Sequence, residues 1–240
     1  MILELKRGMR NHFFTLMALI SVLNVLLGYI LLVTIDELQI VTFSDLWESV
    51  YTVYTQFGTL LFSTIIIMQF YRDYKEKNII FYKALNKDAV SYYVSKFVTL
   101  VIGSMIGTLI SSLLICMPYS QYKWLPIIFL KTEAVMIYYC IIMSLLGFLF
   151  ENFLIGFFIS FTTWIIGIFI SDISPSFKYF AYYDAAGKDY KAFIDFVNGK
   201  ISLHNIITDI ENSYIFDLCL FGLCILLVLF FSRRWNRNGI

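Results

Sequence analysis

Residues 13–35 have the sequence "FFTLMALISVLNVLLGYILLVTI", an apolar run of 23 residues. A helix rises about 1.5 Å per residue, so roughly 20 residues cross the roughly 30 Å hydrocarbon core of a bilayer. A secretory signal has an apolar region of only about 7–15 residues and ends at a small-residue cleavage site. Asp36 and Glu37 follow this run instead. The run is therefore predicted to be a retained membrane-spanning helix.

The composition extends this prediction to the whole chain. Of the 240 residues, 60% are hydrophobic and 15% are charged, whereas soluble domains carry about 25% charged residues. In lipid, each backbone polar group must bond within its own segment, so the apolar runs are expected to be helices. We predict an all-α polytopic membrane protein, with residues 1–240 as a single transmembrane domain. The predicted spans are residues 13–35, 50–71, 97–118, 126–150, 153–171 and 213–232.

The distribution of charge predicts the orientation of these spans. Twelve of the 18 lysines and arginines lie at one set of span ends, together with five acidic residues. The opposite ends carry five lysines and ten acidic residues. Because an excess of Lys and Arg marks the cytoplasmic side, both termini and residues 72–96 are predicted to be cytoplasmic, and residues 172–212 extracellular. The net charge of +1 gives no reason to expect a nucleic-acid partner.

The predicted cytoplasmic segment contains "FYKALNKDAVSYYVSKF", residues 81–97. We expect two short helices, the first over about 73–85 and the second, capped by Asn86 or Asp88, running into the third span. The composition leaves two interpretations open. The segment could lie on anionic lipid, held by its lysines, or it could dock a cytoplasmic partner.

Three features of the sequence resemble a type-2 ABC transporter membrane subunit, the six-span permease of a bacterial ABC exporter. They are the leader "ELKRGMRNHFF" at 4–14, an acid-bearing helix after span two, and residues 81–97. The pattern covers nearly the whole chain, although many family members have proline where this chain has Asn86. The resemblance implies that residues 1–12 form an amphipathic connecting helix and that a coupling helix sits in a groove on an ATP-binding subunit. The implied contact residues are Asp73, Tyr74, Glu76, Ile79, Tyr82 and Leu85.

The partners and cofactors follow from the same resemblance. Two ATP-binding subunits and a second copy of this permease, or a similar chain, are implied. A P-loop needs G-x-x-x-x-G-K-[ST], and the Gly-Lys pairs at 187–188 and 199–200 lack that context. We therefore expect no cofactor in this chain, with ATP and Mg²⁺ held by the partner. No catalytic or metal-binding motif is found, and we predict that the chain is not an enzyme. The cysteines, which are expected to be reduced packing residues, are Cys116, Cys140, Cys219 and Cys224.

Two sets of residues within the predicted spans are candidate sites. Charge inside a bilayer is costly, so Lys131, Glu133 and Asp217 are expected either to snorkel to the outer interface or to line an outward vestibule, with Lys131 and Asp217 as a pair. Small residues spaced four apart allow close helix contact. Gly103, Gly107 and Ser111 therefore predict either packing within one chain or a dimer seam.

The segment 172–212 is predicted to contain an amphipathic helix. Apolar residues recur there with helical spacing at Tyr190, Phe193, Ile194 and Val197. The resemblance implies short, partly re-entrant helices over the outer mouth of a pathway. The helix is therefore either a gate that meets the cargo or simple interfacial packing.

The expected function is that of a permease in the bacterial cell membrane, exporting a hydrophobic or amphipathic cargo with ATP hydrolysed by a separate subunit. The cargo is expected to be a peptide, a toxin, a lipid-linked molecule or a drug. By analogy with small family members, export of an antimicrobial peptide or immunity to one is favoured. One alternative is a stand-alone membrane immunity protein that sequesters a toxin without ATP. Another is a small-solute binding subunit that works with an unrelated energising module.

Overall fold

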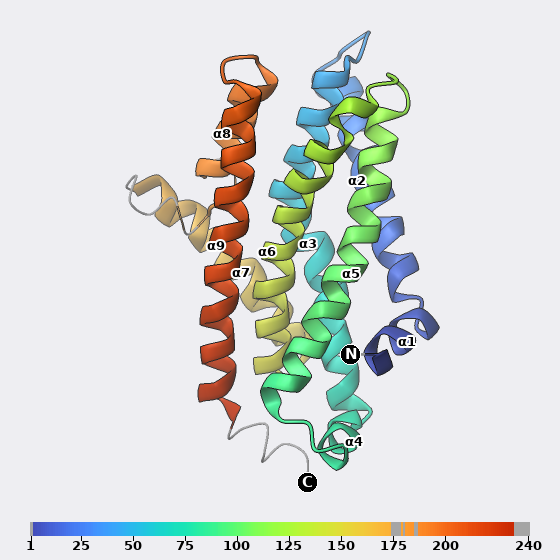
Figure 1. Ribbon diagram of the computed structural model, residues 1–240, viewed down its shortest axis with the longest axis vertical. Helices are drawn as coiled ribbons and strands as arrows, with labels where there is room; N and C mark the ends of the chain where they lie inside the picture. Colours follow the sequence, from blue (N-terminus) through green and yellow to red (C-terminus); the bar gives the residue numbers. More distant parts are fainter. Residues whose placement is uncertain (1, 174–178, 180, 185–186, 233–240) are drawn as a thin grey trace.

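A computed structural model describes residues 2–173, 179, 181–184 and 187–232. All regular elements of this part of the chain are helical, and six helices are long and apolar enough to cross a membrane (Figure 1). The predicted fold class is thereby confirmed. In chain order the elements are α1 (Ile2–Arg10), α2 (Phe13–Thr34), α3 (Phe43–Lys75), α4 (Asn78–Ala84), α5 (Ala89–Cys116), the 3-10 helix η1 (Tyr122–Trp124), α6 (Leu125–Leu149), α7 (Phe153–Ile173), α8 (Lys188–Val197) and α9 (Leu203–Phe230).

Three spanning helices extend beyond the apolar runs that predicted them. The second span was predicted over 50–71, but α3 has 33 residues. The third was predicted from residue 97, but α5 begins at Ala89, where the Asp88 carboxylate accepts a hydrogen bond from the backbone N–H of Ser91. Such a cap satisfies an N–H that has no partner within the helix. Hydropathy therefore marks the membrane-crossing part of each helix rather than its ends.

The same effect extends the sixth span. This span was predicted over residues 213–232. Ser202 caps α9 by accepting a hydrogen bond from the backbone N–H of Asn205, and α9 continues without a break to Phe230. Part of the predicted extracellular segment is thus the first third of α9.

The predicted coupling segment is divided differently from the single helix expected over 73–85. The spanning helix α3 continues to Lys75, and the chain breaks at Lys77, whose φ of 54° lies in the left-handed region. The short helix α4 follows, and a turn at Asn86, with φ 52°, leads to the Asp88 cap. Asparagine tolerates this backbone conformation better than most residues.

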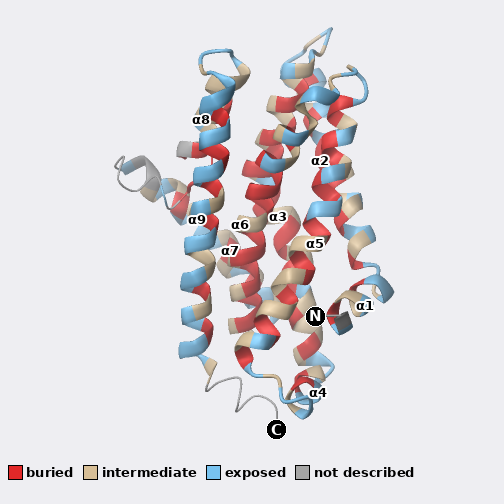
Figure 2. Ribbon diagram, in the orientation of Figure 1, coloured by how far each residue is buried: buried red, intermediate tan, exposed pale blue. Residues whose placement is uncertain are grey.

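The core lies where α3, α5 and α6 pack together, with α2 against α3 and α5. Helices α7 and α9 bury few of their residues within the chain, and α9 is largely pale blue in Figure 2. Large apolar side chains such as Phe169 and Leu218 are 69% and 73% exposed there. Such an apolar surface suits contact with lipid. Lipid tails shield these side chains from water without any protein packed against them.

The two ends of the bundle carry different elements. Helices α1 and α4 and the C-terminal end of α9 lie at one end, while α8 lies toward the other (Figure 1). This arrangement groups the basic segments of the sequence on one side. That this side faces the cytoplasm remains the prediction of the charge distribution.

Candidate functional site

An ion-pair cluster joins three helices at the α4 end of the bundle. Asp73, near the end of α3, is fully buried, and its carboxylate lies 2.6 Å from the Lys96 ammonium of α5. The Tyr92 hydroxyl donates to the same carboxylate at 2.8 Å. From α1, Arg7 pairs with Asp73, and Glu4 lies 2.8 Å from Lys96. We call Glu4, Arg7, Asp73, Tyr92 and Lys96 the inner cluster.

The inner cluster balances its charges internally. Burial lowers the pKa of Arg7, but the attraction and hydrogen bond of Asp73, together with attraction to Glu4 and Glu76, raise that pKa above its ordinary value. Two cations and two carboxylates thus neutralise one another in a site where Glu4, Asp73 and Lys96 are almost inaccessible to water. Because each charge depends on the others for stabilisation, α1 is fixed to the bundle rather than lying free on the membrane surface.

Helix α4 has two different faces. Ile79 and Tyr82 are buried, and the Tyr82 ring packs edge-to-face on Tyr92 with centroids 5.0 Å apart. Arg7 donates to the Tyr82 hydroxyl at 3.4 Å. On the other face, three large apolar side chains are about half exposed. They form what we call the α4 patch: Ile80, Phe81 and Leu85.

This geometry corrects the predicted contact residues of the coupling helix. Asp73, Ile79 and Tyr82 are buried within the chain, so they are not available to a partner. The Tyr74 hydroxyl donates to the backbone carbonyl of Phe148 at 2.7 Å. Glu76 and Leu85 alone of the six are exposed. The correction arises because the break at residue 77 rotates α4 relative to α3.

Ile80 and Phe81 were not among the predicted contact residues, although the sequence carries a signal for them. Positions 80, 81, 84 and 85 lie on one side of a helix and are all apolar in this chain. Positions 79 and 82 belong to the other side. A single helix over 73–85 would place Tyr74, Ile79, Tyr82 and Leu85 on one side, so the prediction followed that side instead.

A second buried cluster joins four helices toward the other end of the bundle. Lys131 of α6 is fully buried, with its ammonium 2.5 Å from Asp189 of α8 and paired also with Asp209 of α9. Asp189 also accepts hydrogen bonds from the hydroxyls of Tyr51 in α3 and Ser213 in α9. We call these five residues the outer cluster. The predicted pair of Lys131 with Asp217 is wrong, and Lys131 does not snorkel to the outer interface.

The other two ionisable candidate residues, Glu133 and Asp217, are also buried in protein contacts. Asp217 accepts a hydrogen bond from the Tyr183 hydroxyl at 3.0 Å. Glu133 accepts hydrogen bonds from the hydroxyls of Ser104 and Thr108, at 2.7 and 2.6 Å, and pairs with no cation in the described part of the chain. Both are at most 3% exposed, so neither snorkels to the outer interface.

The small residues of α5 lie against α2 of the same chain. A Cβ at Gly103 would meet the Phe13 ring, and one at Gly107 would meet Ser21 and the Met17 carbonyl. The Ser111 hydroxyl donates to the Ser21 carbonyl at 3.1 Å. The three residues therefore serve packing within one chain, and they leave no surface for the predicted dimer seam.

Helix α8, predicted from its apolar spacing, packs inward over α3. Phe193 is fully buried, with its ring centroid 4.1 Å from that of Tyr51 and 5.3 Å from that of Trp47. The hydroxyls of Tyr190 and Thr52 are 2.8 Å apart. The remaining two predicted gate residues, Ile194 and Val197, are half-buried against the same core. Any gate here would have to separate a well-packed contact.

Six membrane-length helices with buried ion pairs near both ends define a multi-pass membrane protein. The chain belongs to the peptide export permease protein YydJ family, whose model matches residues 1–240. A "Probable peptide export permease protein YydJ" of Bacillus subtilis (strain 168) is 28% identical over 242 residues, covering 99% of each chain. No solved structure matches this chain. The protein is thus a multi-pass bacterial membrane permease.

Proposed function

We propose that the chain is the membrane-spanning subunit of a bacterial ABC exporter that moves a hydrophobic or amphipathic peptide outward. Two separate ATP-binding subunits would hydrolyse the ATP, and a second copy of this permease or a similar chain would complete the transporter. Membership of the peptide export permease family supports the cargo class. The two-faced α4 helix supports the source of energy.

The observation that carries this proposal is the contrast between the two faces of α4. Its inner face is held by the inner cluster through Tyr82, while the α4 patch is open to a partner. Lys75 and Lys77, both exposed, flank the patch. An ATPase groove with an apolar floor and an acidic rim would complement this surface, because interface cores are apolar and charges at the rim steer association.

A displacement of α4 would be transmitted to the spanning helices through a continuous series of contacts. Tyr82 contacts Arg7 and Tyr92, which bind Asp73 of α3. Helix α3 also carries Tyr51, the donor to Asp189 in the outer cluster. The two clusters are 22 positions apart on one helix, or about 33 Å at 1.5 Å per residue. Closure of the ATPase pair would then shift α3 as a unit and loosen α8 over the outer mouth.

Co-purification tests the proposal. The permease is tagged and expressed in its native host, and the ATP-binding cassette proteins that co-elute with it are quantified. Phe81→Asp and Leu85→Asp place a charge in the apolar floor of the interface, and each is expected to reduce the recovered ATPase at least tenfold. Asn86→Asp is the matched control, because it adds the same charge to an exposed neighbour outside the patch.

Two results would contradict the proposal. One is that no ATPase co-elutes with the wild-type chain. The other is that the patch variants retain as much ATPase as Asn86→Asp does. Unchanged thermal unfolding of each variant in detergent shows that a loss of binding reflects the surface and not the fold.

A further inference from the structure

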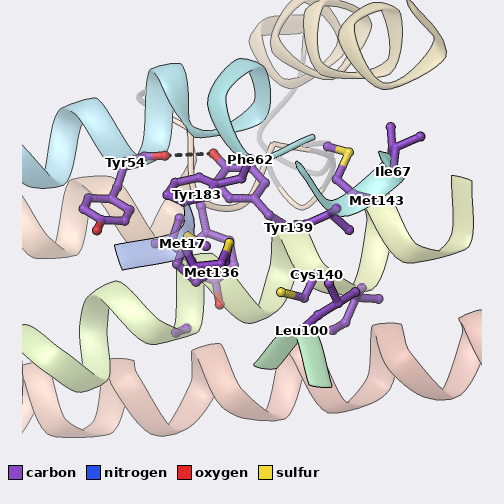
Figure 3. Packing of buried hydrophobic residues seen from close by; sticks show 14 of the residues in the cluster. Met17, Tyr54, Phe62, Ile67, Leu100, Met136, Tyr139, Cys140, Met143 and Tyr183 are labelled. Carbon is purple, nitrogen blue, oxygen red and sulfur yellow. Dashed lines mark hydrogen bonds between the residues drawn. The ribbon is translucent and has the colours of Figure 1, made fainter. Parts of the chain in front are cut away.

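A cavity of about 380 Å³ lies between α3, α6, α7 and the segment 181–184. It is distinct from the inner and outer clusters and contains none of the predicted pathway residues. Tyr139, Met143 and Tyr183, which belong to its wall, are part of the buried cluster drawn in Figure 3. Sites for small ligands in proteins measure about 300–1,000 Å³, so this volume suffices for a ligand group.

The wall of this cavity is mainly apolar. Helix α6 contributes Ile142, Met143 and Leu146, and α7 contributes Ile166 and Ile170. Protein interiors are close-packed, and atoms that line a gap lose dispersion contacts. A bulky apolar group entering the cavity would regain those contacts and leave water or lipid at little cost.

Polar groups in the wall are largely satisfied within the chain. The hydroxyls of Thr163 and Tyr139 donate to backbone carbonyls, and the indole N–H of Trp164 donates to Asp184 at 3.0 Å. The Tyr138 hydroxyl, by contrast, has no hydrogen-bond partner among the described residues. Among the described residues, the cavity therefore offers mainly apolar walls together with the unpaired hydroxyl of Tyr138, which suits an apolar side chain next to a peptide carbonyl.

The position of α7 gives such a ligand a way in. This helix contacts the bundle along one side only and tilts away from the other spans in Figure 1. It supplies Ser160, Thr163, Trp164 and Gly167 to the cavity wall. A wall with few contacts on its far side can move outward without disturbing the packed core of α3, α5 and α6.

We propose that this cavity binds one bulky apolar side chain, aromatic or branched, of the exported peptide, and that Tyr138 donates to an adjacent peptide carbonyl. The proposal rests on the proposed function, since it takes the cargo to be a peptide. It adds which part of the peptide the permease recognises and where.

Photolabelling tests the proposal with the full chain in lipid nanodiscs. The probe is N-acetyl-4-benzoylphenylalanine amide, whose excited ketone inserts into nearby C–H bonds. Labelling is expected at Met143, and excess N-acetylphenylalanine amide should compete while N-acetylglycine amide should not. Thr163→Phe fills the cavity and should reduce labelling at least tenfold. Thr162→Phe, at the neighbouring exposed residue outside the cavity wall, should leave labelling unchanged.

If Thr163→Phe fails to fold, the variant Tyr138→Phe tests the proposal in its place. Tyr138→Phe removes only the free hydroxyl and should weaken competition by N-acetylphenylalanine amide several-fold. Labelling that is unchanged in Thr163→Phe would overturn the proposal. If that variant does not fold, unchanged competition by N-acetylphenylalanine amide in Tyr138→Phe would overturn it. So would a benzophenone-tagged fatty acid that labels Met143 more strongly than the peptide probe, because the cavity would then be a lipid site. This assay contains no ATPase, so it can fail while co-purification succeeds, and the reverse.

Discussion

Asp73 and Lys131 are the buried charges on which the inner and outer clusters depend. Each lies at 0% exposure and has at least two charged partners from other helices. A buried ion pair is only weak evidence of added stability, because desolvation offsets much of the attraction. Removal of one partner is different, since it leaves a buried charge without compensation. These residues therefore fix which helices contact each other.

Replacement of Lys131 by methionine is expected to destabilise the protein by roughly 3–5 kcal/mol, because Asp189 would remain buried without its cation. Thermal unfolding in detergent measures the effect. Lys123→Met, at an exposed lysine of η1, should change stability by no more than about 0.5 kcal/mol. The double variant Lys131→Met with Asp189→Asn should recover part of the loss. A Lys131→Met protein as stable as the wild type would refute the role of the outer cluster.

Ion-pair partners from distant parts of the sequence explain why individual site residues were predicted less well than helices. Lys131 was recognised as unusual because a charge within an apolar run is conspicuous. Its partners, Asp189 and Asp209, lie 58 and 78 positions away in segments that look like ordinary acidic outer surface. Nothing in their local sequence distinguishes them from the exposed acids around them. The pairing is set by the tertiary packing of α6, α8 and α9.

Helix α5 has a side-chain cap, Asp88, at its N-terminus. Hydrogen bonds from the hydroxyl and backbone N–H of Ser91 lower the pKa of Asp88 below its ordinary value. Asp88→Ala should cost about 1 kcal/mol of stability at neutral pH, as measured by thermal unfolding.

The pH dependence of this effect has a definite sign. Because the folded pKa is lower than the unfolded one, the charged cap stabilises the protein above the unfolded pKa. This contribution is lost as the pH falls through the folded pKa. The stability gap between wild type and Asp88→Ala should therefore shrink below about pH 4. A gap that widens on acidification would contradict the cap.

The contact between α2 and α5 depends on the absence of a side chain at Gly107. A methyl group there would collide with Ser21 and approach the Met17 carbonyl to 3.1 Å. Gly107→Ala is therefore expected to destabilise by roughly 1–3 kcal/mol despite the better helix propensity of alanine. At Gly222 of α9 nothing lies within 4 Å, so Gly222→Ala should be neutral or slightly stabilising. Equal effects of the two variants on thermal unfolding would contradict this packing.

The elements themselves were largely predictable, because runs of 18 or more apolar residues have few alternatives to spanning helices. The ends of the helices were less predictable. Lys96 and Asp73 place charge where the hydropathy pattern stops, yet α3 and α5 continue through them because the two charges neutralise each other. The break at Lys77 was also not predictable, since lysine rarely adopts a positive φ. The orientation of α4 followed from that break.

For the molecule as a whole, α3 is the element that connects its two ends. It binds α1, α4 and α5 through the inner cluster, and α6, α8 and α9 through the outer cluster. Energy delivered to α4 can therefore reach α8 without passing through loops. This arrangement serves export only if α4 faces the cytoplasm, where ATP is available.

Labelling of single cysteines in intact cells can establish the side on which α4 lies. In a Cys219→Ser background, which removes the exposed native thiol, Leu85→Cys reports on the α4 patch. Ile40→Cys, 82% exposed at the opposite end of the bundle, reports on the other side. With a membrane-impermeant maleimide, we expect Ile40→Cys to react in intact cells and Leu85→Cys to react only after permeabilisation. Reaction of Leu85→Cys in intact cells would contradict ATP-driven coupling through α4.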